Sequence, residues 1–116
     1  MTKRLSLLLA TLLLFSPTRA HANPEVLLRQ AEKYYEQLEY VASLKILLAL
    51  QQQKGVTAIQ RARGYLYMGV CFTALGKVEN AVQSFMEVVK LRPRFRLPSG
   101  VSPSIRAMFV EALKRL

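Results

Sequence analysis

Few residues of this chain have side chains that could do acid–base or metal chemistry. The 116-residue sequence contains one histidine, His21, one cysteine, Cys71, and no aspartate; all seven acidic residues are glutamates. A serine or cysteine nucleophile needs a neighbouring base, which is most often histidine. A zinc site needs several histidine or cysteine ligands. We therefore expect no catalytic residues, no metal site and no cofactor, and an enzyme is the least favoured class of protein.

The first 22 residues have the layout of a secretory signal peptide. Lys3 and Arg4 precede an apolar run at 5–15, and residues 20–22 supply the small side chains typical of a cleavage site. The apolar run has 11 residues, whereas a membrane-spanning helix needs about 20. We expect cleavage after Ala22 and export, with the bacterial periplasm favoured over secretion. An uncleaved N-terminal anchor is the alternative interpretation.

The chain is strongly basic, with a net charge of +10. Without residues 1–22 the charge is +7, and the chain then contains no histidine. Such a balance suggests an acidic partner, an anionic membrane or nucleic acid. The segment KLRPRFRLPSG at 90–100 carries Arg94 and Arg96, which alternate with apolar residues and are expected to form an exposed basic edge. Nucleic acid is not expected as a partner, because the chain is exported and has no interleaved aromatic platform.

The spacing of apolar residues after position 22 predicts helices and no strands. Asn23, Thr57 and Ser102 are expected to be N-caps, and proline follows two of them at Pro24 and Pro103. The five expected helices cover about 25–37, 40–53, 58–75, 78–91 and 103–115, with a linker at 94–102.

The segment GYLYMGVCFTALGKVENAVQSFMEVVKLRP at 64–93 resembles a tetratricopeptide repeat (TPR). Met68 and Val88 depart from the commonest residues of that family, and both keep an apolar side chain. Small residues at the helix crossing let two helices approach closely, and a glycine permits a tight turn between them. The positions that carry the resemblance are Tyr65, Gly69, Phe72, Gly76, Ala81, Phe85 and Pro93.

A fainter copy of the pattern lies 38 residues earlier. Ala31 then matches Gly69, and Leu47 matches Phe85. The first copy departs from the pattern at Leu38, where the family has a turn glycine. The two copies cover about 25–57 and 62–95, and the extra residues of the first copy fall in QQQKGVT. Tyr34 is matched to Phe72, Ser43 to Ala81, and Leu27 stands where the outer aromatic is usual.

The expected fold of residues 23–116 is all-α: antiparallel helical hairpins forming a short TPR-like solenoid of about two repeats, plus a C-terminal capping helix. Each hairpin of a solenoid buries its apolar face only against a neighbour. We expect Ile105, Phe109 and Leu113 to pack on the second repeat. The alternative is that 103–115 is the first helix of an incomplete third repeat, which another chain completes.

The resemblance implies a groove for a peptide or protein partner, lined by the first helix of each hairpin. The carboxylate clamp of that family needs asparagines that are missing here, so recognition of a peptide C-terminus is not implied. The alternative role of Tyr35 and Tyr67 is purely structural, and Cys71 is expected to be a buried structural thiol. The candidate groove residues are Arg29, Tyr35, Arg63, Leu66, Tyr67 and Val70, with Leu28, Glu32 and Thr73 on the same faces.

Together these features predict a non-enzymatic exported adaptor or scaffold that mediates protein–protein interaction in the bacterial cell envelope. The partner is expected to be another protein or peptide, and the mature chain is not expected to span a membrane. The alternative is a basic envelope protein that binds anionic lipid or acidic polymer surfaces. The dependence of binding on salt concentration distinguishes the adaptor from the anionic-surface binder, because screening weakens binding to an anionic surface more than binding in an apolar groove.

Overall fold

The computed structural model describes residues 22–116, and this part of the chain contains five helices and no strands. The predicted all-α class is confirmed. The predicted signal peptide lies outside the described residues, except for Ala22. The helices are α2 (Pro24–Glu36), α3 (Tyr40–Gln51), α4 (Ala58–Ala74), α5 (Val78–Leu91) and α6 (Pro103–Lys114).

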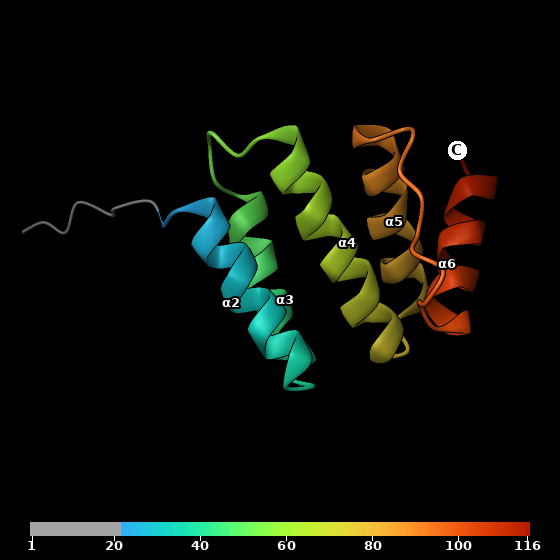
Figure 1. Cartoon of the computed structure of the whole chain (residues 1–116), viewed down its shortest axis with the longest axis horizontal. Coiled ribbons are helices and arrows are strands. Elements are labelled where there is room, and N and C mark those ends of the chain that lie inside the picture. Colours follow the sequence, from blue (N-terminus) through green and yellow to red (C-terminus); the bar gives the residue numbers. More distant parts are fainter. Residues whose placement is uncertain (1–21) are drawn as a thin grey trace, which may run out of the picture.

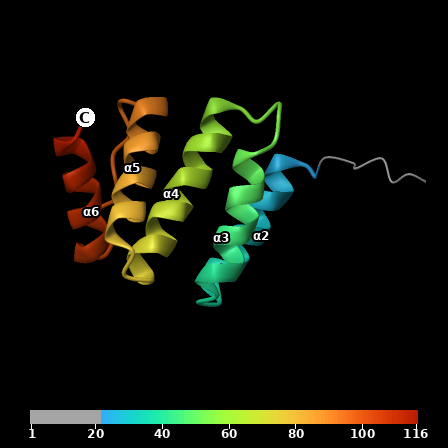
Figure 2. The ribbon, with the colours of Figure 1, turned by 180° about the vertical axis from the view of Figure 1, so that it is seen from behind.

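The hairpin of α2 and α3, with α2 in front of α3, lies at one end of the molecule, and α4, α5 and α6 follow in the order of the sequence (Figure 1). α3 packs on both α2 and α4, and α5 packs on both α4 and α6. The view from behind shows the same order (Figure 2). α6 also touches α4, just as α4 touches α2. Each helix therefore contacts its neighbours in the sequence, and the linker joins the end of α5 to the start of α6.

The predicted N-caps are confirmed. The Asn23 side chain accepts a hydrogen bond from the Glu25 amide at 2.9 Å, and the Ser102 hydroxyl accepts one from the Ile105 amide at 3.3 Å. Thr57 and Gln60 form a capping box, in which each side chain accepts from the backbone amide of the other residue. Such caps satisfy amides that a helix leaves without partners at its start.

The turn between α2 and α3 repeats the turn between α4 and α5 after 38 residues. The Lys77 amide donates to the Phe72 carbonyl at 2.9 Å, and the Glu39 amide donates to the Tyr34 carbonyl at 2.8 Å. The equivalent residues in these turns are Gly76, with φ of 72°, and Leu38, with φ of 62°. Leu38 thus adopts the left-handed conformation that favours glycine, and the turn keeps its geometry without one.

The core consists of two clusters that meet at α4. Phe72 of α4 packs against both of them, and Cys71 is fully buried, as expected. Burial raises the pKa of the Cys71 thiol, so the thiol is protonated at neutral pH. The buried residues of the first cluster are Leu28, Ala31, Leu44, Leu47, Leu50, Met68 and Cys71; those of the second are Ala81, Val82, Phe85, Phe109 and Ala112.

Two glycines of α4 lie where neighbouring helices approach most closely. A Cβ atom at Gly69 would lie 2.5 Å from the Phe85 ring of α5, which confirms the predicted close crossing. A Cβ atom at Gly64 would lie 2.6 Å from the Gln51 side chain and 3.0 Å from that of Leu50. The second contact was not predicted, because Gly64 belongs to no recognised position of the repeat.

Two predicted side-chain positions are wrong. Leu113 is 46% exposed, and Ala112 is buried against α5 and the rest of the second cluster instead. The contact stripe of α6 follows Ile105, Phe109 and Ala112, and Leu113 lies one residue, or about 100° of helix rotation, beyond it. Leu28 is fully buried in the first cluster and does not face the groove.

Candidate partner-binding groove

A hollow of about 730 Å³ lies among α2, the start of α3, α4, the linker and the start of α6. Four of the six predicted groove residues line it: Tyr35, Leu66, Tyr67 and Val70. Thr73 lines it as well. We call this hollow the tyrosine groove. Its complete lining is Tyr35, Tyr40, Leu66, Tyr67, Val70, Thr73, Ala74, Leu97, Pro98, Gly100, Val101, Ser102, Ser104 and Ile105.

Three tyrosines form a contiguous cluster in the groove. The Tyr35 and Tyr67 ring centroids lie 6.0 Å apart with an interplanar angle of 64°, and those of Tyr35 and Tyr40 lie 5.8 Å apart at 54°. Tyr35 and Tyr40 flank the α2–α3 turn, and Tyr67 comes from the middle of α4. Edge contacts of this kind orient aromatic rings. All three rings are half-buried, so each keeps a surface for a partner.

The hydroxyl of Tyr67 stays protonated far above neutral pH. Burial and the neighbouring Glu32 carboxylate raise the pKa of Tyr67 to about 12, and Glu36 adds to the effect. Burial also raises the pKa of Tyr35. The groove therefore offers neutral phenol groups at physiological pH, each able to donate and to accept a hydrogen bond.

The apolar wall of the groove comes from α4 and the linker. Leu66 and Val70 line the groove and also pack against the second core cluster, as do Leu97 and Ile105. The linker was not predicted to line the groove. Tyr40 was also missed. The only available signal was that Tyr40 follows directly after the α2–α3 turn, close to Tyr35 in the chain.

Arg29 and Arg63 do not line the tyrosine groove. Arg63 of α4 forms an ion pair with Glu25 of α2 at 3.1 Å. The Gln60 side chain also donates to Glu25, and these contacts, with that of Gln60 the larger, lower the pKa of the Glu25 carboxyl. Arg29 is exposed on α2. The structure thus gives Arg63 a role in joining two helices.

Arg61 of α4 caps the end of α3. Its guanidinium donates to the Gln51 carbonyl and to the Gln53 carbonyl, both at 2.9 Å. The Gln51 side chain returns a hydrogen bond to the Arg61 carbonyl at 3.1 Å. A cation at the negative end of a helix is favourable, so Arg61 fixes α3 to the start of α4.

The predicted basic edge lies on the linker. Arg94 and Arg96 are exposed, and Phe95 between them is half-buried with its ring centroid 5.9 Å from that of Phe109. The Arg92 guanidinium lies 6.0 Å from the Phe95 centroid. Within residues 22–116 none of these three arginines forms an ion pair. Their charges are therefore accessible from solvent.

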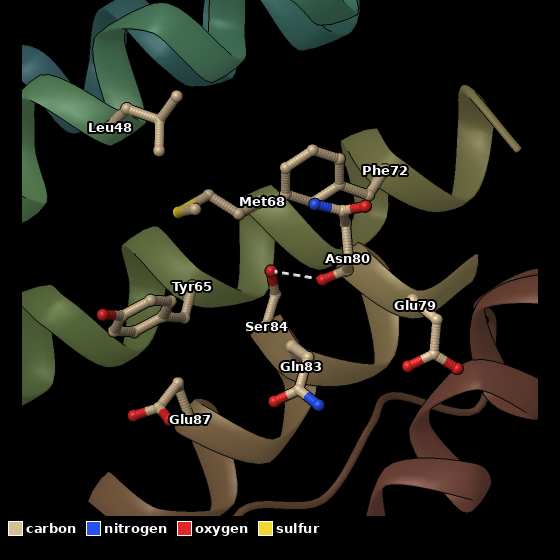
Figure 3. A pocket seen from close by; sticks show the side chains of 9 residues that line it. All are labelled: Leu48, Tyr65, Met68, Phe72, Glu79, Asn80, Gln83, Ser84 and Glu87. Atoms are coloured by element: carbon tan, nitrogen blue, oxygen red, sulfur yellow. Dashed lines mark hydrogen bonds between the residues drawn. The ribbon is translucent and has the colours of Figure 1, made fainter. Parts of the chain in front are cut away.

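A second hollow, of about 350 Å³, lies between Leu48 of α3 and the polar face of α5 (Figure 3). Tyr65, Met68 and Phe72 of α4 contribute its apolar side. The remaining lining residues are Glu79, Asn80, Gln83, Ser84 and Glu87.

Three of its polar side chains already have partners within the chain. The Glu87 carboxylate pairs with Lys90 at 3.2 Å. Ser84 donates to the Asn80 carbonyl at 2.8 Å, and the Glu79 carboxylate pairs with Arg115 at 2.8 Å. The tyrosine groove is larger, and three tyrosines of its lining contact one another, so it is the better candidate for binding.

No group of three or more histidine, cysteine, aspartate or glutamate side chains in residues 22–116 is placed to hold a metal ion. In the same residues no helix has both the length and the apolar character needed to cross a membrane.

Comparison with known proteins gives no family assignment. No protein-family model, curated protein or solved structure matches the chain.

Proposed function

We propose that this protein is a non-enzymatic, exported adaptor of the TPR type, which binds another protein or a peptide in the cell envelope of a bacterium. The observation that carries the proposal is the tyrosine groove, a half-buried aromatic cluster between the first helices of two similar hairpins. Support for the TPR type comes from the motif at 64–93 and from the turn that recurs after 38 residues. Support for export comes from the layout of residues 1–22 alone.

The groove suits a short segment of polypeptide. Binding sites are commonly concave and mostly apolar, with a few polar groups that fix the orientation of the ligand. Tyrosine is enriched at protein interfaces because it combines a large apolar ring with a hydrogen-bonding hydroxyl. Tyr35 and Tyr67 supply both properties, and the aliphatic wall of Leu66, Val70 and Leu97 offers area for apolar side chains.

An affinity pull-down from envelope extract tests the proposal. Tyr67→Ala removes a ring at the centre of the groove and is expected to lose the partners that the wild-type protein retains. The matched control is Gln83→Ala, which alters the second hollow and is expected to retain those partners. Circular dichroism checks that both variants are folded. Equal recovery by the wild type and Tyr67→Ala would contradict the proposal.

The second candidate function is binding to anionic surfaces, and the accessible charges of Arg92, Arg94 and Arg96 favour it. Sedimentation with vesicles of anionic lipid measures it directly. Binding that is lost between 50 and 500 mM salt, and lost in Arg94→Glu with Arg96→Glu at low salt, would support this function, since exposed charges are screened over about 10 Å at 0.1 M salt. Equal sedimentation with neutral vesicles would exclude it.

A further inference from the structure

The lining of the tyrosine groove is uncharged, although the chain as a whole is strongly basic. None of its fourteen lining residues has a charged side chain, whereas the protein carries a net charge of +10. Three other hollows in the described part of the chain each include at least one charged residue, such as Glu79, Lys33 or Arg94. Because burying a charge without a partner is costly, the part of a partner that enters the tyrosine groove is expected to be uncharged.

Two tyrosine hydroxyls in the groove are free to donate hydrogen bonds. Within residues 22–116 the side-chain hydroxyls that donate to other groups are those of Ser43, Thr73 and Ser84. The hydroxyls of Tyr35 and Tyr40 are not among them. A phenol donor pairs well with a carbonyl oxygen, so the groove suits a ligand whose backbone carbonyls have no partner of their own.

The walls of the groove offer few acceptors to the backbone amides of a partner. Its helices use their own carbonyls internally, and residues 22–116 contain no strand whose edge a partner could extend. On the linker, the Pro98 carbonyl already accepts a hydrogen bond from Arg106 at 2.8 Å. A bound extended segment would therefore bury N–H groups among few acceptors, which is unfavourable. Proline has no such N–H group.

The three tyrosine rings of the groove are tilted against one another. The rings of Tyr35 and Tyr40 make an angle of 54°, and those of Tyr35 and Tyr67 make an angle of 64°. Proline-rich segments form a polyproline II helix, in which the carbonyls make no internal hydrogen bonds. Such segments dock in grooves lined by aromatic side chains. The tyrosine cluster and its free hydroxyls match both properties.

On the basis of the proposed function, we propose that the groove binds an uncharged, proline-rich segment of the partner in the polyproline II conformation. The prolines pack on the tyrosine rings, and backbone carbonyls accept hydrogen bonds from the hydroxyls of Tyr35 and Tyr40. The aliphatic wall of Leu66, Val70 and Leu97 contacts the other side of the segment. A helical segment uses its own carbonyls, so it would leave these two hydroxyls without backbone acceptors.

Fluorescence anisotropy of two labelled nonapeptides with the purified protein tests this choice of ligand. One peptide repeats Pro-Pro-Gln three times, and the other has alanine in place of every proline; both have blocked ends and uncharged residues. We expect the proline peptide to bind at least about tenfold more tightly, because proline restricts the free peptide and so reduces the entropy lost on binding. Between about 50 and 500 mM salt its affinity is expected to change by less than about twofold, since no charged residue lines the groove.

Phenylalanine substitutions separate the hydroxyls from the rings. The double variant Tyr35→Phe with Tyr40→Phe keeps both rings and is expected to bind the proline peptide at least about fivefold more weakly, since two hydrogen bonds are lost. Tyr34→Phe is the matched control, because Tyr34 lies on α2 outside the groove, and it is expected to leave the affinity unchanged. Tyr67→Ala removes a ring and is expected to abolish binding. Circular dichroism checks that each variant is folded.

Equal affinity for the two peptides, or tighter binding of the alanine peptide, would overturn the proposed ligand. Failure of the proline peptide to bind at about 1 mM would do the same. The adaptor function is judged separately, by the partners that Tyr67→Ala loses from envelope extract. If those partners are lost while the proline peptide fails to bind, only the choice of ligand is wrong. If Tyr67→Ala retains them as well, the proposed function fails too.

Discussion

Gly69 and Phe85 meet where α4 crosses α5. In the first hairpin a different pair of residues occupies the equivalent positions. A Cβ atom at Gly69 would lie 2.5 Å from the Phe85 ring. The equivalent positions 38 residues earlier hold Ala31 and Leu47, both fully buried. A larger residue on the first helix thus accompanies a smaller one on the second. Cores conserve volume in this way because both cavities and overpacking are destabilising.

The exchange predicts a coupled pair of substitutions. Gly69→Ala is expected to destabilise the protein by about 2 kcal/mol, because the added methyl group displaces the Phe85 ring. Adding Phe85→Leu reproduces the pair of the first hairpin and is expected to make the double variant more stable than the sum of the single effects by at least about 1 kcal/mol. Urea unfolding followed by circular dichroism measures all three. Additive losses would contradict the explanation.

Leu38 is the site of a second informative substitution. Its backbone is left-handed, with φ of 62°, and its side chain is 71% exposed. Such a conformation costs a residue with a Cβ atom about 1–2 kcal/mol, and little apolar burial is lost on removing the side chain. We expect Leu38→Gly to raise stability by about 1 kcal/mol and Gly76→Leu, the matched change, to lower it by at least as much. A drop in melting temperature for Leu38→Gly would contradict the strain.

At the scale of the helices, the sequence predicted the parts that follow local rules. The N-caps at Asn23, Thr57 and Ser102 were predicted because a capping side chain acts on amides two or three residues away. The orientation of α6 was predicted one residue out of register at Leu113, since several apolar residues of α6 give two overlapping stripes. The choice between them depends on how α5 is placed, which no local pattern encodes.

The residues of the groove were also predicted only where they follow a local sequence pattern. Tyr35, Leu66, Tyr67 and Val70 were named from their positions in the repeat, and the structure brings these four to one hollow. The linker residues that complete the hollow belong to no periodic pattern. Their placement depends on the path of the chain between α5 and α6, so the sequence alone could not assign them to the groove.

The hydrogen bonds of Arg61 at the junction between α3 and α4 are expected to stabilise the fold. Arg61→Leu removes hydrogen bonds to two carbonyls at the end of α3 and is expected to cost about 1–3 kcal/mol. Arg61→Lys is expected to recover less than half of this loss, because an ammonium lacks the fork that reaches both carbonyls. Arg29→Leu, on the exposed side of α2, is the control and is expected to change stability by less than about 0.5 kcal/mol. Thermal unfolding compares the three.

For the whole molecule, two ion pairs join residues that lie 38 and 36 positions apart in the sequence. Glu25 of α2 binds Arg63 and Gln60 of α4, and Glu79 of α5 binds Arg115, the C-cap residue of α6. Hydrogen bonds from Gln60 and Arg63 lower the pKa of Glu25, and that from Arg115 lowers the pKa of Glu79, both from an ordinary value of 4.5. A depressed pKa in the folded state means that the unfolded chain binds more protons as the pH falls.

The stability of the fold is therefore expected to decrease at acidic pH. The contribution of both pairs is present above about pH 4.5 and is lost as the pH falls through the lower folded-state values. The double variant Glu25→Gln with Glu79→Gln is expected to show a shallower decline of the melting temperature between pH 5 and pH 2 than the wild type. Identical slopes would show that these carboxylates do not link folding to protons.

Site-specific photo-crosslinking shows whether the tyrosine groove holds a protein partner. A photoreactive amino acid is placed at Thr73, in the groove, or at Gln83, in the second hollow, and the protein is irradiated in envelope extract. We predict a discrete crosslinked protein from position 73 that is absent from position 83. The same crosslinked protein from position 83, with none from position 73, would contradict it.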